Sequence, residues 1–258
     1  MTKQDDIIEF PSVRRGLILT SREQRMEGMA VSVKVRMRLG RKIEKLKKLL
    51  LELGAQVEKN VRLSVQAVVF RDPEMAAGVI DGDHLIDTAE VDLEEECLEI
   101  LALHQPVAND LRFIVAVLKI NNDLERIGDL AVNIAQTAVV LPTRQEMELP
   151  FDYGPMAQMT QSMLKKSLDA FVNLDVDLAI EVCAQDDEVD YMKHVIHEKF
   201  LEKIREGEPR LEALAVLFLV SRHLERIADH ATNIAEDVIY IVTGAIHRHR
   251  AAEFAVEE

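Results

Sequence analysis

Apolar residues recur along most of this chain at intervals of three and four, which is the spacing of one face of an α-helix. Between about residues 41 and 70 they fall in near-heptad spacing, at Ile43, Leu46, Leu50, Leu53, Val57, Val61 and Val65. Similar patterns cover about residues 73–103, 106–140, 156–173, 176–205 and 209–242. Pro11 precedes these stretches, and the other six prolines fall between them or at their starts, where proline is tolerated. The pattern therefore predicts six long helices.

One segment departs from the helical pattern. Apolar Val31, Val33, Val35, Met37 and Leu39 alternate with Ser32, Lys34, Arg36 and Arg38. A period of two is typical of a β-strand. An extended arm or the start of a helix fits residues 31–39 equally well, so the three interpretations stay open at this point.

The second half of the chain repeats the first. The sequence LERIGDLAVNI at residues 124–134 recurs as LERIADHATNI at residues 224–234. Upstream, Asp83 matches Asp186 and Pro106 matches Pro209, and the members of each pair lie 103 residues apart. Such self-similarity indicates an internal duplication, in which one structural unit occurs twice.

The halves match helix for helix, so the sequence predicts an all-α fold of two tandem antiparallel three-helix bundles. We divide the chain on this basis into five segments: a basic N-terminal extension (1–37), a first bundle (38–141), a proline-containing linker (142–155), a second bundle (156–244) and a C-terminal tail (245–258).

Acidic residues four apart recur in both halves. On each LERI helix they form a row nearly opposite the apolar stripe: Glu125, Asp129 and Asn133, repeated as Glu225, Asp229 and Asn233. The preceding helix carries Asp83 with Asp87, repeated as Asp186 with Asp190. Like charges at this spacing destabilise a helix by a few tenths of a kcal/mol. Because both copies keep that cost while other surface positions have diverged, we favour a site over a merely solvated face.

If neighbouring helices align these rows, four carboxylates converge in each half. We call them the first acidic cluster (Asp83, Asp87, Glu125, Asp129) and the second acidic cluster (Asp186, Asp190, Glu225, Asp229). Such a cluster needs a cation to offset its repulsion, or must hold protons. Oxygen ligands favour Mg²⁺, Mn²⁺, Ca²⁺ or oxidised iron, whereas zinc is less natural.

Other polar residues accompany the acids. Arg126 and Arg226 follow the first acid of each copy, and we favour ion pairing with the neighbouring acids over anion binding. His84, His194, His197 and His230 lie close to the acidic rows in sequence. Val91 and Glu94 occupy the positions in the first half that correspond to His194 and His197, so we interpret these histidines as surface residues.

Composition narrows the function classes. A net charge of −15 and the absence of tryptophan argue against a nucleic-acid-binding protein. Residues 14–48 are the exception, with 12 Lys/Arg against 3 acids. Cys97 and Cys183 fit ordinary buried thiols. The longest apolar run is too short to span a bilayer and no apolar signal region opens the chain, so we expect a cytoplasmic protein.

At this point the motifs resemble those of a known family, PhoU. The resemblance rests on QPVANDLR at 105–112, LERIGD at 124–129 and LERIADHATNIAE at 224–236, and it covers about residues 38–244. It implies two tandem three-helix bundles with a multinuclear metal cluster on each, held here by the two acidic clusters. It also implies a negative regulator of the phosphate response that links the ATPase subunit of the phosphate ABC transporter to a sensor histidine kinase.

The expected cofactors are oxygen-ligated metal ions: iron, zinc, manganese or magnesium. Residues that could assist the ligands are Arg126, Asn133, Arg226 and Asn233. With the family resemblance we also expect a homodimer that meets the membrane only through its partners. The chain carries no nucleotide-binding, nucleophile-elbow or zinc-protease motif, so we expect no enzyme. The alternatives are a metal-dependent hydrolase or redox enzyme that uses the carboxylates, and a scaffold whose acids are only solvated.

Overall fold

The computed structural model describes the backbone of residues 21–141 and 151–244, and the side chains of these ranges from residue 37 onward. Within them the secondary structure consists of helices: α1 (Ser21–Phe70), α2 (Pro73–Gly82), α3 (His84–His104), α4 (Ala108–Val140), α5 (Gly154–Asn173), α6 (Val176–Arg205) and α7 (Leu211–Thr243). The chain divides into two compact units, Met1–Arg41 and Lys42–Glu258. The predicted all-α fold is confirmed, and the helices of the second unit are described below.

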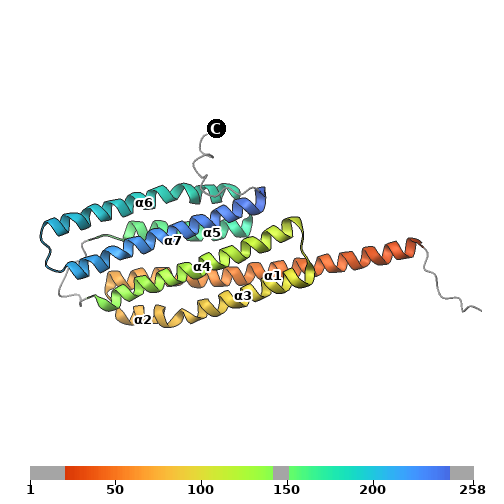
Figure 1. The fold of residues 1–258 in the computed structure, drawn as a ribbon, viewed down its shortest axis with the longest axis horizontal. Coiled ribbons are helices and arrows are strands. Elements are labelled where there is room, and N and C mark those ends of the chain that lie inside the picture. Colours follow the sequence, from red (N-terminus) through yellow and green to blue (C-terminus); the bar gives the residue numbers. More distant parts are fainter. Residues whose placement is uncertain (1–20, 142–150, 245–258) are drawn as a thin grey trace, which may run out of the picture. The chain divides into compact units, whose positions relative to one another are not determined.

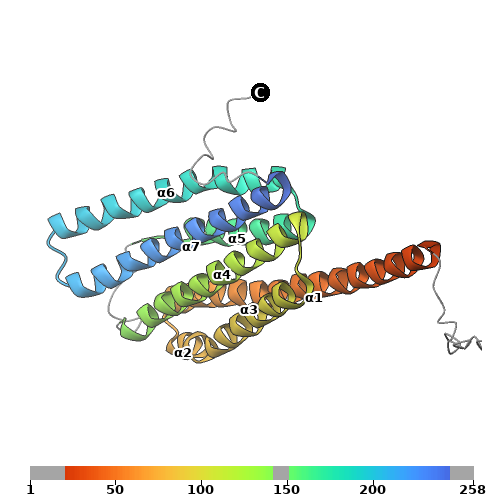
Figure 2. The same ribbon diagram turned by 45° about the vertical axis from the view of Figure 1, so that its right-hand side comes forward.

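The helices of the second unit form two groups that share one interface. In the first group α4 packs against α2 and α3, and in the second α7 packs against α5 and α6. Helices α4 and α7 lie side by side and join the two groups (Figures 1 and 2). Helix α1 contacts α4, where the Lys47 ammonium lies over the Phe113 ring. The two groups correspond to the two predicted bundles, α2 and α3 together taking the place of one helix.

The predicted apolar stripes form the core. Leu46, Leu50, Leu53, Val57, Val61 and Val65 of α1 are buried, and Ile43 is half-buried. On α4 the buried stripe is Leu124, Ile127, Ala131, Ile134 and Ala138, and on α7 it is Leu224, Ile227, Ala231 and Ile234. Both cysteines are free and buried, and burial raises the pKa of each thiol to about 12. The stripes thus explain why these residues form bundles in water.

Two details of the helix prediction are wrong. Residues 31–39 belong to α1, which begins about twenty residues before the predicted helix start, so of the three interpretations the helical one is correct and the strand is not. Alternation of apolar and polar residues is a weak signal here, because five of the nine residues are good helix formers: Lys34, Arg36, Met37, Arg38 and Leu39. The predicted single helix over 73–103 is divided into α2 and α3 at Asp83.

The division at Asp83 follows from its local sequence. Asp81-Gly82-Asp83 is a run of poor helix formers. Helix α2 starts cleanly, with Pro73 in its first turn and the Asp72 carboxylate accepting hydrogen bonds from the Glu74 and Met75 amides. At the junction the Asp87 amide still donates to the Asp83 carbonyl at 3.1 Å. The one-turn relation between Asp83 and Asp87 therefore survives the break.

The five predicted segment boundaries remain predictions. Residues 1–20, 142–150 and 245–258 lie outside the described residues, and they include most of the predicted linker and the C-terminal tail. Over the part of the chain that is described, no helix combines the length and the apolar character needed to cross a membrane.

Candidate functional site

The first acidic cluster is assembled where α4 crosses the junction of α2 and α3. Asp83 occupies the junction and Asp87 follows in the first turn of α3, while Glu125 and Asp129 lie one turn apart on α4. Gly128 permits this close approach: a Cβ atom there would lie 3.2 Å from Ile86 side-chain atoms and 3.6 Å from Asp83 Oδ1. A missing side chain on α4 therefore helps to bring the two acidic rows together.

The second acidic cluster repeats the arrangement on two continuous helices. Asp186 and Asp190 lie on α6, and Glu225 and Asp229 lie on α7, which packs against α6. Both clusters also share one pattern of exposure. The inner acids, Asp83 and Glu125 or Asp186 and Glu225, are half-buried, and the outer acids, Asp87 and Asp129 or Asp190 and Asp229, are exposed. Each cluster is thus a surface site with two of its four carboxylates partly withdrawn from water.

The inner acids of the first cluster have raised pKa values. Burial raises the pKa of the Asp83 carboxyl, and the charges of Asp87 and Asp129 raise it further. Burial likewise raises the pKa of Glu125, with Asp129 adding to the shift and Arg126 opposing it. These effects act across the α3–α4 interface, so the acids of the two rows lie close enough to repel one another.

The second cluster shows the larger perturbation. Burial raises the pKa of Asp186 to about 6, helped by the charges of Asp229, Asp190, Asp187 and Glu225. Although Asp229 as a whole residue is exposed, partial burial of its carboxyl group raises its pKa, where Glu225 and Asp190 add to the effect and His230 and Lys193 oppose it. A proton or a cation at this cluster would relieve the repulsion.

Some of the inner oxygens fit a hard cation. Asp83 Oδ1 and Glu125 Oε2 are buried and accept no hydrogen bond from the described residues, although Arg126 Nε lies 3.4 Å from Glu125 Oε2. A buried carboxylate oxygen without a partner is costly, and oxygen ligation of Mg²⁺, Mn²⁺ or ferric iron would satisfy it. The donor set of the first cluster therefore suits such an ion.

The two clusters differ at one corresponding position. In the second cluster Lys193 Nζ lies 2.5 Å from Glu225 Oε1 and partly neutralises the acids. The corresponding residue of the first half, 103 positions earlier, is Glu90, whose charge raises the pKa of Glu125. Sequence reasoning missed both residues, although comparison at the repeat offset would have identified them. At this position the first cluster has a further acid and the second has a cation, so the first cluster is the more negative.

The tightest group of potential ligands among the described residues lies elsewhere. His194, His197 and Glu198 of α6 each offer one ligand atom, and these atoms lie within 4.8 Å of one another, whereas no three acids of either cluster meet that limit. The corresponding residues of the first half are Val91, Glu94 and Glu95, so the duplication does not repeat this set. Two imidazoles and a carboxylate suit zinc better than the ions expected at the acidic clusters.

The four accessory residues have different surroundings. Arg126 forms ion pairs with Glu125 at 3.4 Å and with Asp129 at 3.9 Å. Asn233 Nδ2 lies 3.4 Å from Asp123 Oδ1 on α4, and the neighbouring His230 Nδ1 lies 2.8 Å from the same oxygen. Asn133 and Arg226 are exposed. Asn233 is therefore placed in the contact between α7 and α4, beside the second cluster.

The raised pKa of Asp186 predicts a pH dependence for the metal-free protein. The folded protein binds this proton more tightly than the unfolded chain, whose aspartates titrate near the ordinary value of 3.8. The resulting stabilisation is present below that value and is lost as the pH rises through about 6. Between about pH 4 and pH 7, we expect wild type to lose about 1–2 kcal/mol more unfolding free energy than Asp186→Asn, after solvent screening is allowed for. Urea denaturation at each pH measures this difference. The prediction is contradicted if the unfolding free energies of wild type and Asp186→Asn change by the same amount between these pH values.

Comparison with known proteins identifies the family to which this chain belongs. Residues 50–138 and 154–238 match the family model described as PhoU domain, once in each half. The accessory protein PhoU homolog of the phosphate-specific transport system of Clostridium acetobutylicum is 36% identical over 203 residues, which cover 78% of this chain and 93% of the relative. The homolog of Caulobacter vibrioides is 39% identical over 194 residues, covering 74% and 84%.

Two crystal structures have the same fold. PhoU from Pseudomonas aeruginosa is similar with a TM-score of 0.75 and 37% identity, over 80% of this chain and 99% of that one. The phosphate transport system regulatory protein PhoU from Streptococcus pneumoniae has a TM-score of 0.75 and 28% identity, over 81% and 98%. The names of these relatives describe accessory and regulatory proteins rather than enzymes.

Proposed function

Since this chain belongs to the PhoU family, we propose that it is a cytoplasmic accessory protein of a phosphate-specific transport system and a negative regulator of phosphate uptake and of the phosphate-starvation response. The observation that carries this proposal is the duplicated acidic cluster, with the same four carboxylates and the same exposure pattern in both halves. The names of the curated relatives supply the biological context.

In this proposal the acidic clusters hold metal ions. The first cluster offers Asp83, Asp87, Glu125 and Asp129 as oxygen ligands, with Glu90 adding negative charge, and the second offers Asp186, Asp190, Glu225 and Asp229. Bound cations would cancel the repulsion that raises the pKa of the inner acids. The ions supply positive charge and fixed geometry on an exposed surface, so their expected role is to shape a docking face.

The proposed partners are the ATPase subunit of the phosphate ABC transporter and a sensor histidine kinase, and the proposed state is a homodimer. Membrane contact would come only through these partners. An adaptor needs exposed side chains that a partner protein can contact. The outer acids of the two clusters are exposed: Asp87, Asp129, Asp190 and Asp229. Surface residues of this kind act in recognition rather than in folding.

The test is a charge reversal at the outer acids. Cells that express only Asp129→Lys/Asp229→Lys are expected to induce a phosphate-starvation reporter in phosphate-rich medium, because a lysine expels cations from each cluster. The matched control is Asp92→Lys/Glu188→Lys, which makes the same charge change at exposed positions of α3 and α6 outside the clusters. Full repression by the cluster variant, with protein level and helix content unchanged, would refute the proposal.

A further inference from the structure

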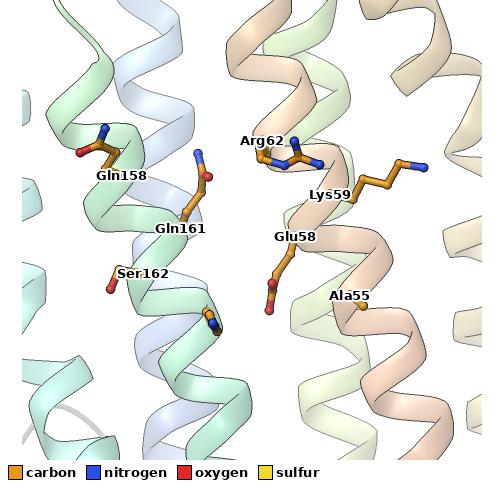
Figure 3. Close-up of a pocket in the computed structure, with 8 residues that line it drawn as sticks. Ala55, Glu58, Lys59, Arg62, Gln158, Gln161 and Ser162 are labelled. Carbon is orange, nitrogen blue, oxygen red and sulfur yellow. The ribbon is translucent and has the colours of Figure 1, made fainter.

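A polar pocket of about 490 Å³ lies between α1 and α5, and neither acidic cluster contributes to it. Figure 3 shows its lining, which comes in equal parts from the two helices: Ala55, Glu58, Lys59, Arg62, Gln158, Gln161, Ser162 and Lys165. The volume is within the range of small-molecule sites. Close packing of the same two helices flanks the pocket, because a Cβ atom at Gly54 would lie 2.7 Å from Leu168 Cδ1.

The pocket is positive in a strongly negative protein. Lys59, Arg62 and Lys165 face one acid, Glu58, so the lining carries a net charge of +2 while the whole chain carries −15. Among the residues with described side chains, no hydrogen bond and no ion pair within 4.0 Å engages any of the three cations. Most other lysines of α1 that are described are paired with acids, as Lys42 and Lys45 are with Glu96. The pocket cations are therefore available to a ligand.

The neutral part of the lining consists mainly of hydrogen-bond donors. The amide groups of Gln158 and Gln161 and the hydroxyl of Ser162 can each donate to an oxyanion. In Figure 3, Gln161 of α5 and Glu58 of α1 stand on the facing sides of the two helices, whereas the Arg62 guanidinium lies across α1 and Lys59 points away from α5. The two helices together thus supply three cations and three neutral donors to the lining, which are the groups that bind phosphoryl oxygens.

We propose that this pocket binds inorganic phosphate anions and has room for more than one phosphoryl group. The Arg62 guanidinium can hold two oxygens of one phosphoryl group, and Lys59 and Lys165 act as point charges along the pocket. This inference goes beyond the proposed function, because the site and its ligand are independent of the metal clusters.

Glu58 would allow the pocket to discriminate between phosphate and sulfate. Its carboxyl is half-buried, and burial raises its pKa although the Lys165 charge opposes the shift. Near neutral pH a phosphate keeps a P–OH group, which can donate a hydrogen bond to this carboxylate. Sulfate has no proton to donate and is repelled. A repulsive element of this kind is a common source of specificity.

The first experiment is calorimetric titration of the full-length, chelator-treated protein with orthophosphate, pyrophosphate, sulfate and citrate. We expect saturable binding of both phosphates, with pyrophosphate about tenfold tighter because it engages more of the cations. Sulfate should bind at least about tenfold more weakly than orthophosphate, and citrate more weakly than pyrophosphate. The proposal is overturned by equal binding of sulfate and orthophosphate, by citrate that binds as tightly as pyrophosphate, or by the absence of saturable phosphate binding, which would point to an acidic protein partner instead.

Variants then locate the site. Lys59→Gln/Arg62→Gln/Lys165→Gln should weaken pyrophosphate binding about a hundredfold, while Lys48→Gln/Lys199→Gln/Arg205→Gln makes the same charge change at exposed positions outside the pocket and should change it less than about threefold. Glu58→Gln should raise sulfate affinity relative to orthophosphate. Equal losses in the two triple variants, or an unchanged sulfate-to-phosphate ratio in Glu58→Gln, would overturn the assignment.

Discussion

Replacing Asp129 and Asp229 together with asparagine is expected to strip bound metal from both acidic clusters and to lower the melting temperature of the metal-loaded protein. Each substitution removes one charged ligand from an exposed outer position. A ligand present at about a thousand times its Kd stabilises the folded state by about 4 kcal/mol. For a chain of this size that corresponds to a shift of about 8–16 °C. Mass spectrometry of metal content and calorimetry measure the two effects.

The metal-free protein should respond in the opposite direction. Without cations the carboxylates repel one another, and Asp129 and Asp229 are among the charges that raise the pKa of Asp83 and Asp186. Removing these two charges should therefore raise the melting temperature once metal is chelated. The control Asp92→Asn/Glu188→Gln, at exposed positions outside the clusters, should show neither effect. Equal metal content in the cluster variant and wild type would contradict the prediction.

Truncating the repeated core leucine is expected to destabilise either bundle severely. Leu124 of α4 and Leu224 of α7 are both 0% exposed, in matching positions of the two copies. Leu124→Ala and Leu224→Ala should each lower the unfolding free energy by about 2–5 kcal/mol, the sum of lost burial and the cavity that remains. Urea denaturation measures the loss as a lower midpoint with an unchanged slope.

Exposed leucines of the same two helix groups provide the comparison. Leu98 of α3 is 52% exposed and Leu219 of α7 is 42% exposed. Leu98→Ala and Leu219→Ala should change the unfolding free energy by less than about 0.5 kcal/mol. If Leu224→Ala costs no more than Leu219→Ala, the repeated stripe does not form the core of the second bundle.

The helices and the core were predictable because their signals are local. A stripe such as Leu46, Leu50 and Leu53 indicates which helix face avoids water, whatever it packs against. The duplication then allowed each half to be checked against the other. The same local rules failed at residues 31–39, where strand-like alternation lies within α1. They also missed the break at Asp83, because a helix that is interrupted at a single residue keeps the same apolar spacing on both sides of the interruption.

The candidate sites depended more on tertiary structure. The acidic rows were visible as residues four apart, but their mutual repulsion depends on how α3 lies on α4 and α6 on α7. The effects of Glu90 on Glu125 and of Lys193 on Glu225 required the same information. The cationic pocket was not predicted. Its lining residues on α1 and α5 lie 103 positions apart, which is the offset of the repeat, but this offset does not indicate that the two helices lie side by side and enclose a pocket.

The sequence by itself determined the helical class, the duplication, the buried stripes and the eight acids, because each of these follows from periods of three to four residues or from direct repetition. The tertiary structure decided which charges meet. Coulomb energies depend on the distance between groups and on their exposure to water, and both are properties of packed helices rather than of a linear order. Helix packing therefore explains why a pocket with a net charge of +2 occurs in a protein with a net charge of −15. It also explains why Lys193 lies beside Glu225 and partly neutralises the second acidic cluster.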